Sequence, residues 1–150
     1  MFCCRIFYNK SIYKASNDIF SMIKEGKAQI NISNVRKITR KMPVFYNPLM
    51  KLNRDVSVLL LQALNKKGMR LADPLAGSGV RSIRFLQELK KSVVKEVVMN
   101  DASLKAVSNI KKNLKLNKTK AVVTNKEGNA FLLNNESFDY IDLDPFGTPV

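Results

Sequence analysis

The chain has 150 residues and carries 26 lysines and arginines against 12 aspartates and glutamates, which gives a net charge of +14. This length suits one domain with a real hydrophobic core. No apolar stretch approaches the roughly 20 residues that a membrane-spanning helix needs, so the sequence excludes a protein held in a membrane by such a helix.

The first 42 residues show mixed periodicity and many charges, and we expect them to be irregular apart from some helix near Asn17–Lys24. Residues 1–24 form a basic extension that only weakly resembles an organellar transit peptide. Cys3 and Cys4 are adjacent, which disfavours an ordinary disulfide and indicates a reducing, cytoplasmic setting. Because the chain has no histidine, these two thiols cannot assemble a metal cluster.

Residues 43–55, "PVFYNPLMKLNRD", are predicted to begin with a loop, because two prolines block a regular ladder there. From Asp55 onwards the apolar residues recur at helical spacing. These residues are Val56, Leu59, Leu60, Ala63 and Leu64. The pattern predicts an amphipathic helix, with Asn53 as its N-cap and Gly68 as its stop.

Strands and helices then alternate to the end of the chain. The predicted strands are "MRLAD" (69–73), "KEVVMND" (95–101), "KAVVTN" (120–125) and "FDYIDLD" (138–144). The first strand runs through a small-residue loop into a helix, and the second runs into another helix. Such alternation predicts an α/β fold, with about four parallel strands and helices on the faces of the sheet.

Ligands bind beyond the carboxyl ends of the strands in sheets of this kind, so the residues that follow each strand are candidate site residues. Asp73 ends the first strand and "PLAGSG" follows it. Gly77 and Gly79 would let the backbone turn tightly and approach a ligand, although a plain strand-to-helix turn explains the same glycines. We expect Asp73 and Gly77 to belong to a cofactor site.

The second and third strands end in further candidates. Asp101 lies 28 residues after Asp73, close to the position where an acidic residue holds the two ribose hydroxyls of a nucleotide cofactor. The alternative role of Asp101 is a helix N-cap. Asn129 and Ala130 follow the third strand and would lie beside an adenine ring if one were bound.

The fourth strand ends in "DLDPFG", which suits methylation of an exocyclic amine and has no use in a nicotinamide enzyme. The lone pair of such an amine is delocalised into the base, so an enzyme must hold the amine hydrogens with acceptors. Asp144 is the predicted catalytic acceptor, and Asp142 is expected to orient the turn. Pro145 would stiffen the turn, and Phe146 would stack on the base.

The charge is unevenly distributed along the chain. Residues 1–126 hold all 26 basic residues and 7 acidic ones, whereas residues 127–150 hold 5 acidic residues and no basic one. A basic body of this strength attracts polyanions, and nucleic acid is the commonest such partner. The alternative is generic solvated charge on a lysine-rich surface.

These features together resemble the tRNA (guanine-N2)-dimethyltransferase family, class I methyltransferases that act on guanine 26, at the junction of the D and anticodon stems of tRNA. The matching segments are "EGKAQI" (25–30), "VFYNPLMKLNRD" (44–55), "GSGVRSIR" (77–84), "ND" (100–101), "NLKLN" (113–117), "GNAF" (128–131) and "FDYIDLDPFGTP" (138–149). The resemblance implies a Rossmann-like sheet, S-adenosylmethionine as the cofactor, and tRNA as the partner.

The resemblance also implies roles for individual residues. Arg54 and Arg84 would help to position the cofactor, Asp101 would hold its ribose, Asn129 and Ala130 would flank its adenine, and Asp144 would be the catalytic carboxylate. Without the resemblance, the two arginines would be interpreted as solvated helix charges.

The resemblance covers roughly residues 25–149, so residues 25–150 are expected to be the N-terminal part of a methyltransferase domain. The remaining strands and the C-terminal tRNA-binding domain of the family would be absent. The sequence is then either a fragment or one of two polypeptides that complete the fold. Two other hypotheses stay open: an amino-methyltransferase that acts on adenine or cytosine of DNA or ribosomal RNA, and a non-catalytic module that binds RNA or the cofactor only.

Overall fold

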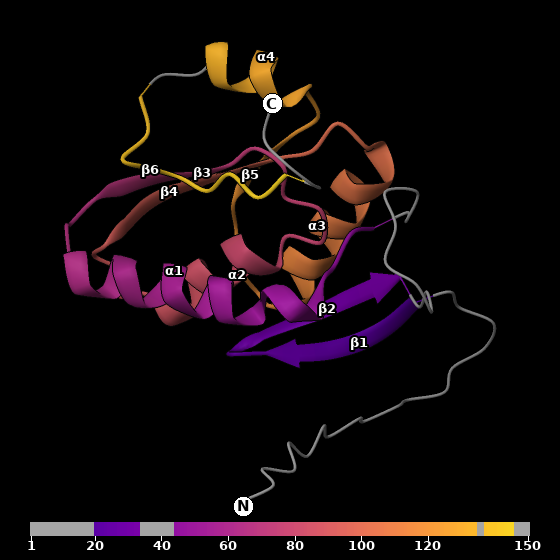
Figure 1. Ribbon diagram of the computed structural model, residues 1–150, viewed down its shortest axis with the longest axis horizontal. Coiled ribbons are helices and arrows are strands. Elements are labelled where there is room, and N and C mark those ends of the chain that lie inside the picture. Colours follow the sequence, from indigo (N-terminus) through magenta and orange to yellow (C-terminus); the bar gives the residue numbers. More distant parts are fainter. Residues whose placement is uncertain (1–19, 34–43, 135–136, 146–150) are drawn as a thin grey trace, which may run out of the picture.

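The computed structural model describes residues 20–33, 44–134 and 137–145 (Figure 1). In chain order the elements are β1 (Phe20–Glu25), β2 (Ala28–Ser33), the 3₁₀ helix η1 (Pro48–Met50), α1 (Lys51–Leu64), β3 (Met69–Asp73), α2 (Val80–Glu88), β4 (Val94–Asn100), α3 (Leu104–Leu116), β5 (Val122–Thr124), α4 (Gly128–Leu133) and β6 (Tyr140–Ile141). Within these ranges no helix is both long enough and apolar enough to cross a membrane. Cys3, Cys4 and Phe146 lie outside the described residues.

Four strands form one parallel sheet in the order β5-β4-β3-β6, which confirms the predicted α/β fold. Leu71 of β3 pairs with Val97 of β4 on one side and with Tyr140 of β6 on the other. The chain first proceeds outward from β3 to β4 and β5, and β6 then joins the opposite side of β3. The strand order therefore reverses beside β3, where a sheet of this type forms its ligand crevice.

The elements are stacked in layers around this sheet. Figure 1 shows α1, α2 and α3 against one face of the sheet, α4 on the other face, and the β1–β2 hairpin beyond the helices. Leu71 faces the larger core with Ile83 and Ile110, whereas the next residue, Ala72, faces the smaller core with Phe131 of α4. Successive residues of a strand point to opposite faces, so β3 is covered on both sides.

The hairpin corrects the prediction for the N-terminal region, because Phe20–Lys24 lies in β1 and is not helical. β1 and β2 pair antiparallel around a two-residue turn, Gly26–Lys27. Gly26 has φ +55°, a conformation that glycine adopts without strain. Ala28 and Ile30 alternate with exposed or half-exposed residues and enter the larger core. This alternation is the strand signal that the helix prediction missed.

The predicted amphipathic helix is present as α1, but its boundaries differ from the prediction. The Asn47 side chain caps η1 by accepting from Leu49 N, and η1 runs directly into α1 at Lys51. Asn53 therefore lies inside the helix and is not its N-cap. The helix ends at Leu64 because Asn65 adopts a left-handed conformation with φ 44°, three residues before Gly68.

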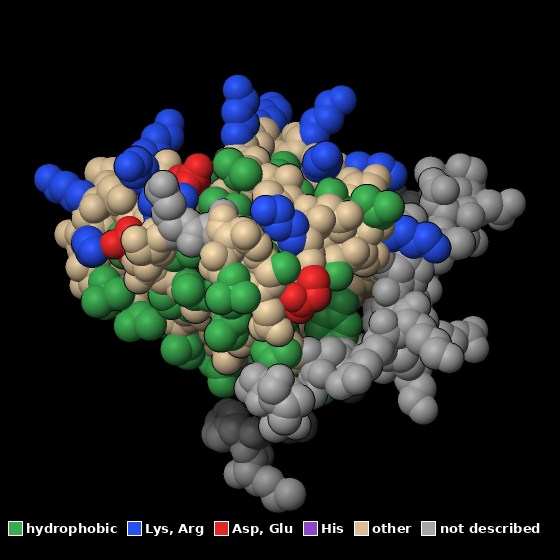
Figure 2. All heavy atoms as spheres, turned by 90° about the horizontal axis from the view of Figure 1, so that it is seen from above, with side chains coloured by type: hydrophobic (Ala, Val, Ile, Leu, Met, Phe, Trp, Pro, Cys, Tyr) green, Lys and Arg blue, Asp and Glu red, His purple; other side chains and the backbone are tan. Residues whose placement is uncertain are grey.

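The apolar face that indicated this helix is not buried in the described part of the chain. The exposed hydrophobic side chains of α1, which we call the α1 stripe, are Leu52, Val56, Leu59, Leu60 and Leu64. The buried face of α1 instead contains Arg54, Ser57, Val58 and Leu61. Figure 2 shows hydrophobic side chains gathered along the side of the molecule where α1 lies. An apolar face of this length is typical of an interaction surface.

Candidate functional site

A cleft lies at the carboxyl ends of β3 and β6, where the strand order reverses. Its lining consists of Phe45, Tyr46, Asn47, Arg54, Asp73, Leu75, Ala76, Gly77, Ser78, Val80, Arg81 and Asp144. Four of the predicted site residues are among them: Arg54, Asp73, Gly77 and Asp144. The fold thus brings together residues from α1, from the end of β3 and its loop, and from the segment after β6.

The glycine loop forms one wall of the cleft and lies tightly against the preceding segment. Gly77 has φ +54°, and a Cβ at this position would lie 2.9 Å from the carbonyl oxygen of Phe45. Ser78 N donates to the same carbonyl at 3.1 Å. A larger residue at position 77 would therefore push the loop away from the 44–47 segment.

Asp101 supports this loop from the end of β4. Its Oδ2 accepts from Gly77 N at 2.8 Å, and its Oδ1 accepts from Ser103 N at 2.8 Å. The N-cap of α3 is Ser103, so the alternative N-cap role of Asp101 does not apply. Asp101 is adjacent to the cleft without lining it, and its contact with a ribose stays a prediction.

Asp73 is the buried carboxylate of the cleft, 6% exposed, and its Oδ2 accepts from Ser82 Oγ at 2.7 Å. Burial raises the pKa of Asp73 to about 7. The hydrogen bond from Ser82 opposes this rise, while the nearby Asp142 carboxylate adds to it. In the folded chain Asp73 is therefore protonated in mildly acidic solution.

This pKa predicts a pH dependence of stability. Between the ordinary value of 3.8 and about 7, the folded chain holds a proton on Asp73 that the unfolded chain has lost, so the free energy of unfolding falls as pH rises. The slope reaches about 1.4 kcal/mol per pH unit. Urea unfolding at pH 5 and pH 7 should show that Asp73→Asn removes this contribution, whereas Asp139→Asn, at an exposed acid with a lowered pKa, retains it. If the free energy of unfolding changed equally with pH in wild type and in Asp73→Asn, Asp73 would not be the group responsible.

Arg81 lines the cleft between two carboxylates, and it is not among the site residues predicted from the sequence. Its Nε lies 3.1 Å from Asp142 Oδ1, and its Nη2 donates to Asp144 Oδ2 at 2.8 Å. Its Nη1 donates to Asn53 and Ser57 of α1. One guanidinium thus joins both carboxylates of the "DLD" segment to α1.

The two carboxylates differ in their exposure. The side chain of Asp142 is 7% exposed, and burial raises its pKa, with the nearby Asp144 adding to the effect and Arg81 opposing it. Its Oδ2 also accepts from Tyr140 at 2.9 Å. The side chain of Asp144 is 35% exposed and lines the cleft. Asp144 can reach a ligand in the cleft, whereas Asp142 serves to fix Arg81 and the turn.

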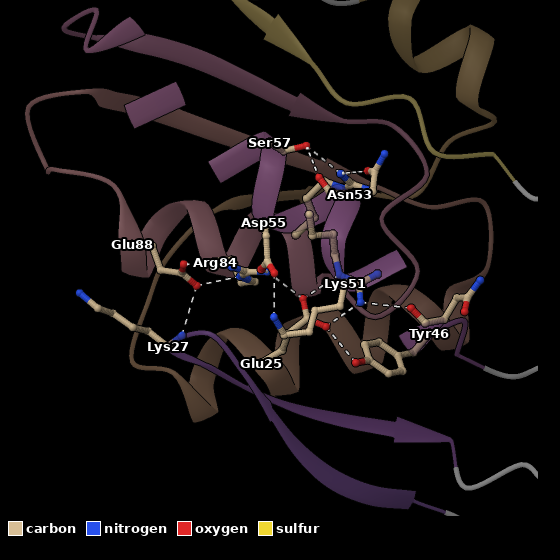
Figure 3. A network of polar contacts seen from close by, with 12 residues as sticks. Glu25, Lys27, Tyr46, Lys51, Asn53, Asp55, Ser57, Arg84 and Glu88 are labelled. Carbon is tan, nitrogen blue, oxygen red and sulfur yellow. Dashed lines mark hydrogen bonds and ion pairs between the residues drawn. The ribbon is translucent and has the colours of Figure 1, made fainter. Parts of the chain in front are cut away.

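Arg54 and Arg84 both pair with Glu25 in a buried ion-pair network. Figure 3 shows Arg84 in this network, but of the two arginines only Arg54 lines the cleft. Arg84 donates to Glu25, Asp55 and Glu88 through all three of its nitrogens. Burial by itself lowers the pKa of Arg84, but these carboxylates raise it above its ordinary value. The predicted cofactor contact of Arg84 is not tested by this arrangement and stays a prediction.

Asn129 and Ala130 lie in α4 and are not among the residues that line the cleft. Ala130 N donates to the side chain of Glu127, the N-cap of this short helix. A Cβ at Gly128 would lie 3.3 Å from Leu75 Cδ2, so the start of α4 is next to the glycine loop. The predicted contact of these two residues with adenine stays a prediction.

Sequence reasoning missed Arg81 and Glu25. Arg81 and Arg84 are three residues apart and occupy the same side of α2, so their spacing does not distinguish them. The position of Arg81 in the first turn after the glycine loop was the available signal, because that turn faces the ligand in such sheets. Glu25 begins the first segment of the family resemblance, but nothing local indicates its partners, which lie 29 and 59 residues further along the chain.

Comparison with known sequences gives a consistent result. The model of the N2,N2-dimethylguanosine tRNA methyltransferase family matches residues 26–150. The tRNA (guanine(26)-N(2)/guanine(27)-N(2))-dimethyltransferase of Aquifex aeolicus is 45% identical over 138 residues, which cover 86% of this chain and 35% of that protein. The tRNA (guanine(26)-N(2))-dimethyltransferase of Pyrobaculum aerophilum is 47% identical over 108 residues, covering 71% of this chain and 29% of that protein. This chain spans about a third of the length of these relatives.

Solved structures support the same relationship. Trm1 from Pyrococcus horikoshii, in complex with S-adenosyl-L-methionine, superposes with a TM-score of 0.71 at 35% identity and covers 85% of this chain and 36% of that one. Trm5b from Pyrococcus abyssi has a TM-score of 0.64 at 18% identity, which indicates a shared fold only. The predicted family is therefore confirmed: the chain belongs to the N2,N2-dimethylguanosine tRNA methyltransferase family.

Proposed function

We propose that this chain is the cofactor-binding part of an S-adenosylmethionine-dependent enzyme that dimethylates N2 of guanine 26 in tRNA. The observation that carries the proposal is the cleft at the ends of β3 and β6, in which Asp144 pairs with Arg81 and which Arg54 and Asp73 also line. Its relatives from Aquifex aeolicus and Pyrobaculum aerophilum bear this activity in their names.

The residues of the cleft fit the groups of S-adenosylmethionine. Arg54 and Arg81 provide guanidinium groups for the carboxylate of its methionine moiety, and the carboxylate of Asp73 suits its positive charges. Asp101 stands beside the glycine loop, where it would accept from the ribose hydroxyls. Arg84, Asn129 and Ala130 are further proposed contacts, the last two at the adenine.

The bound cofactor would supply an electrophilic methyl group. Asp144 would accept a hydrogen of the guanine amine and so orient the nitrogen lone pair and disperse the positive charge that develops on nitrogen. Arg81 holds Asp144 at 2.8 Å and restricts its rotamers. Phe146, two residues further on, would stack on the extruded guanine.

The positive charge of the surface suits the phosphate backbone of tRNA. Exposed lysines occur along α3 and in the segments on either side of β5: Lys105, Lys111, Lys112, Lys115, Lys118, Lys120 and Lys126. Figure 2 shows lysine and arginine side chains projecting along one edge of the molecule, opposite the edge where hydrophobic side chains gather. Binding through such residues weakens steeply as salt rises.

We further propose that additional strands complete the sheet, so that residues 25–150 act as the N-terminal part of a larger domain and residues 1–24 as an extension. β6 pairs only with β3 among the described strands, and α1, whose Ser57 contacts Asp142 just after β6, carries the exposed α1 stripe. An open strand edge next to an apolar surface favours addition of a further strand. The completing segment would belong to a longer polypeptide or to a separate one.

A chimera tests this function directly. Residues 1–150 are fused to the C-terminal two-thirds of the Aquifex aeolicus relative and incubated with S-adenosylmethionine and a tRNA transcript that carries guanine 26. We expect N2-methylated guanosine in the nuclease digest, and no product from a matched transcript with adenine 26. Methyladenine or methylcytosine as the sole product would instead support the adenine or cytosine hypothesis. Absence of any product, together with no cofactor binding by calorimetry, would support the non-catalytic hypothesis.

A further inference from the structure

We propose that Glu25, at the turn of the β1–β2 hairpin, is a positioning residue of the cofactor site and holds Arg54 in the orientation in which it lines the cleft. This inference rests on the proposed function, in which Arg54 contacts the cofactor. Glu25 does not line the cleft and is 2% exposed, so it can act on a ligand only through other side chains. It begins the "EGKAQI" segment, to which the proposed function assigns no role.

Glu25 binds Arg54 with both of its carboxylate oxygens. Arg54 Nε lies 2.7 Å from Glu25 Oε1, and Arg54 Nη2 lies 2.6 Å from Glu25 Oε2. Such a bidentate pair fixes the plane of the guanidinium as well as its place. Burial by itself raises the pKa of Glu25, but the bonds from Arg54, Tyr46 and Arg84 hold it below its ordinary value. The carboxylate is therefore charged at neutral pH.

Tyr46 and Asn47 also help to hold the Arg54 side chain in place. The hydroxyl of Tyr46 donates to Glu25 Oε2 at 2.9 Å, and its ring lies 5.1 Å from the centre of the Arg54 guanidinium. The Asn47 carbonyl accepts from Arg54 Nη2 at 3.1 Å. Among the described residues Arg54 Nη1 makes no hydrogen bond, whereas all three nitrogens of Arg84 do. Arg54 thus keeps one nitrogen for a ligand of the cleft that it lines.

The hairpin is itself held firmly enough to position a side chain. Asparagines of α3 and its C-cap bind the second edge of β2 as a neighbouring strand would: Asn113 Oδ1 accepts from Asn31 N at 2.8 Å, and the C-cap Asn117 Oδ1 accepts from Gln29 N at 2.8 Å. Asn113 Nδ2 also donates to the Ser78 carbonyl of the glycine loop at 2.9 Å. The hairpin, the glycine loop and Arg54 are therefore connected through hydrogen bonds.

The test compares Glu25→Gln with Glu88→Gln in the full 150-residue chain, with S-adenosylhomocysteine as the calorimetric probe. Glu88 belongs to the same network but bonds Arg84 and the Lys27 backbone rather than Arg54. Arg84 keeps Glu25 and Asp55 as partners when Glu88 is replaced, so Glu88→Gln is a matched control. We expect Glu25→Gln to weaken binding roughly 10-fold or more, as loss of one charge-assisted hydrogen bond does, and Glu88→Gln to change it less than about 2-fold. Equal effects of the two substitutions would mean general loosening of the fold and would overturn the proposal.

A double-mutant cycle separates positioning from stability. In an Arg54→Met background, Glu25→Gln should cause no further loss of affinity, because its effect passes through Arg54. A further loss as large as that in the wild-type background would overturn the proposal, as would unchanged affinity in Glu25→Gln. If Glu25→Gln does not fold, Glu25→Asp replaces it, and wild-type affinity in that variant counts against the proposal.

The experiments give a different result if the proposed function is wrong than if the role of Glu25 is wrong. If the wild-type chain and the chimera both fail to bind the probe, cofactor binding is refuted, and the Arg54 Nε–H signal in nitrogen-15 NMR spectra then decides the role of Glu25. We expect a sharp, slowly exchanging signal in wild type and in Glu88→Gln, and its loss in Glu25→Gln. A signal that persists in Glu25→Gln would show that Arg54 is held without Glu25.

Discussion

Replacing Asp144 with alanine is expected to lower the rate of methyl transfer by the chimera roughly 10²–10⁴-fold, the usual contribution of a positioned acid or base. Cofactor binding should be retained, because Asp73, Arg54 and the glycine loop remain in the cleft. Asp144 is a third exposed, and its partner Arg81 keeps Asp142, so the fold should change little. Single-turnover rates and calorimetry with S-adenosylmethionine measure the two effects separately.

Asp139→Asn is the control for this substitution. Asp139 lies just before β6, and its carboxylate accepts from Lys66 Nζ and from Arg70 N, outside the cleft. Its replacement removes one acid from the same segment and should leave the rate within about 2-fold of wild type, as expected of a group that does not enter the transition state. An undiminished rate in Asp144→Ala would remove Asp144 from catalysis.

Replacing Arg81 with methionine is expected to destabilise the chain by about 3–5 kcal/mol, because it leaves Asp142 as a buried charge without its partner. Arg81 and Asp142 are 6% and 7% exposed at their side chains, and their closest atoms are 3.1 Å apart. The same substitution frees Asp144, so the chimera should also lose methyl transfer. Urea unfolding at pH 7 measures the loss of stability.

The matched control is Lys66→Met, which removes the surface ion pair with Asp139. The Lys66 side chain is 63% exposed, and exposed pairs contribute at most about 1 kcal/mol. Arg81→Lys retains the charge but loses the planar donor set, and it should be intermediate between wild type and Arg81→Met. If Arg81→Met lowered the free energy of unfolding by less than about 1 kcal/mol, the buried charge of Asp142 would not need this ion pair for its stabilisation.

The strands and helices from residue 69 onwards were predictable because their signals are local. Apolar residues at a spacing of two or near 3.6 mark the buried face of a strand or helix whatever it packs against. The same logic failed at two places. The β1–β2 hairpin is short and carries charged residues, which obscured its alternation, and the start of α1 depends on η1 and its Asn47 cap.

The sequence by itself determined the fold class, the family and the candidate residues at the ends of the strands, since each of these depends on residues close to one another in the chain. Only the tertiary structure decided which arginine of α2 lines the cleft, and that Glu25 is bonded to Arg54 across 29 residues and to Arg84 across 59. It also decided that the α1 stripe is exposed while Arg54 of the same helix is buried. Ion pairs and burial depend on how distant segments pack, and no periodicity along the chain encodes that packing.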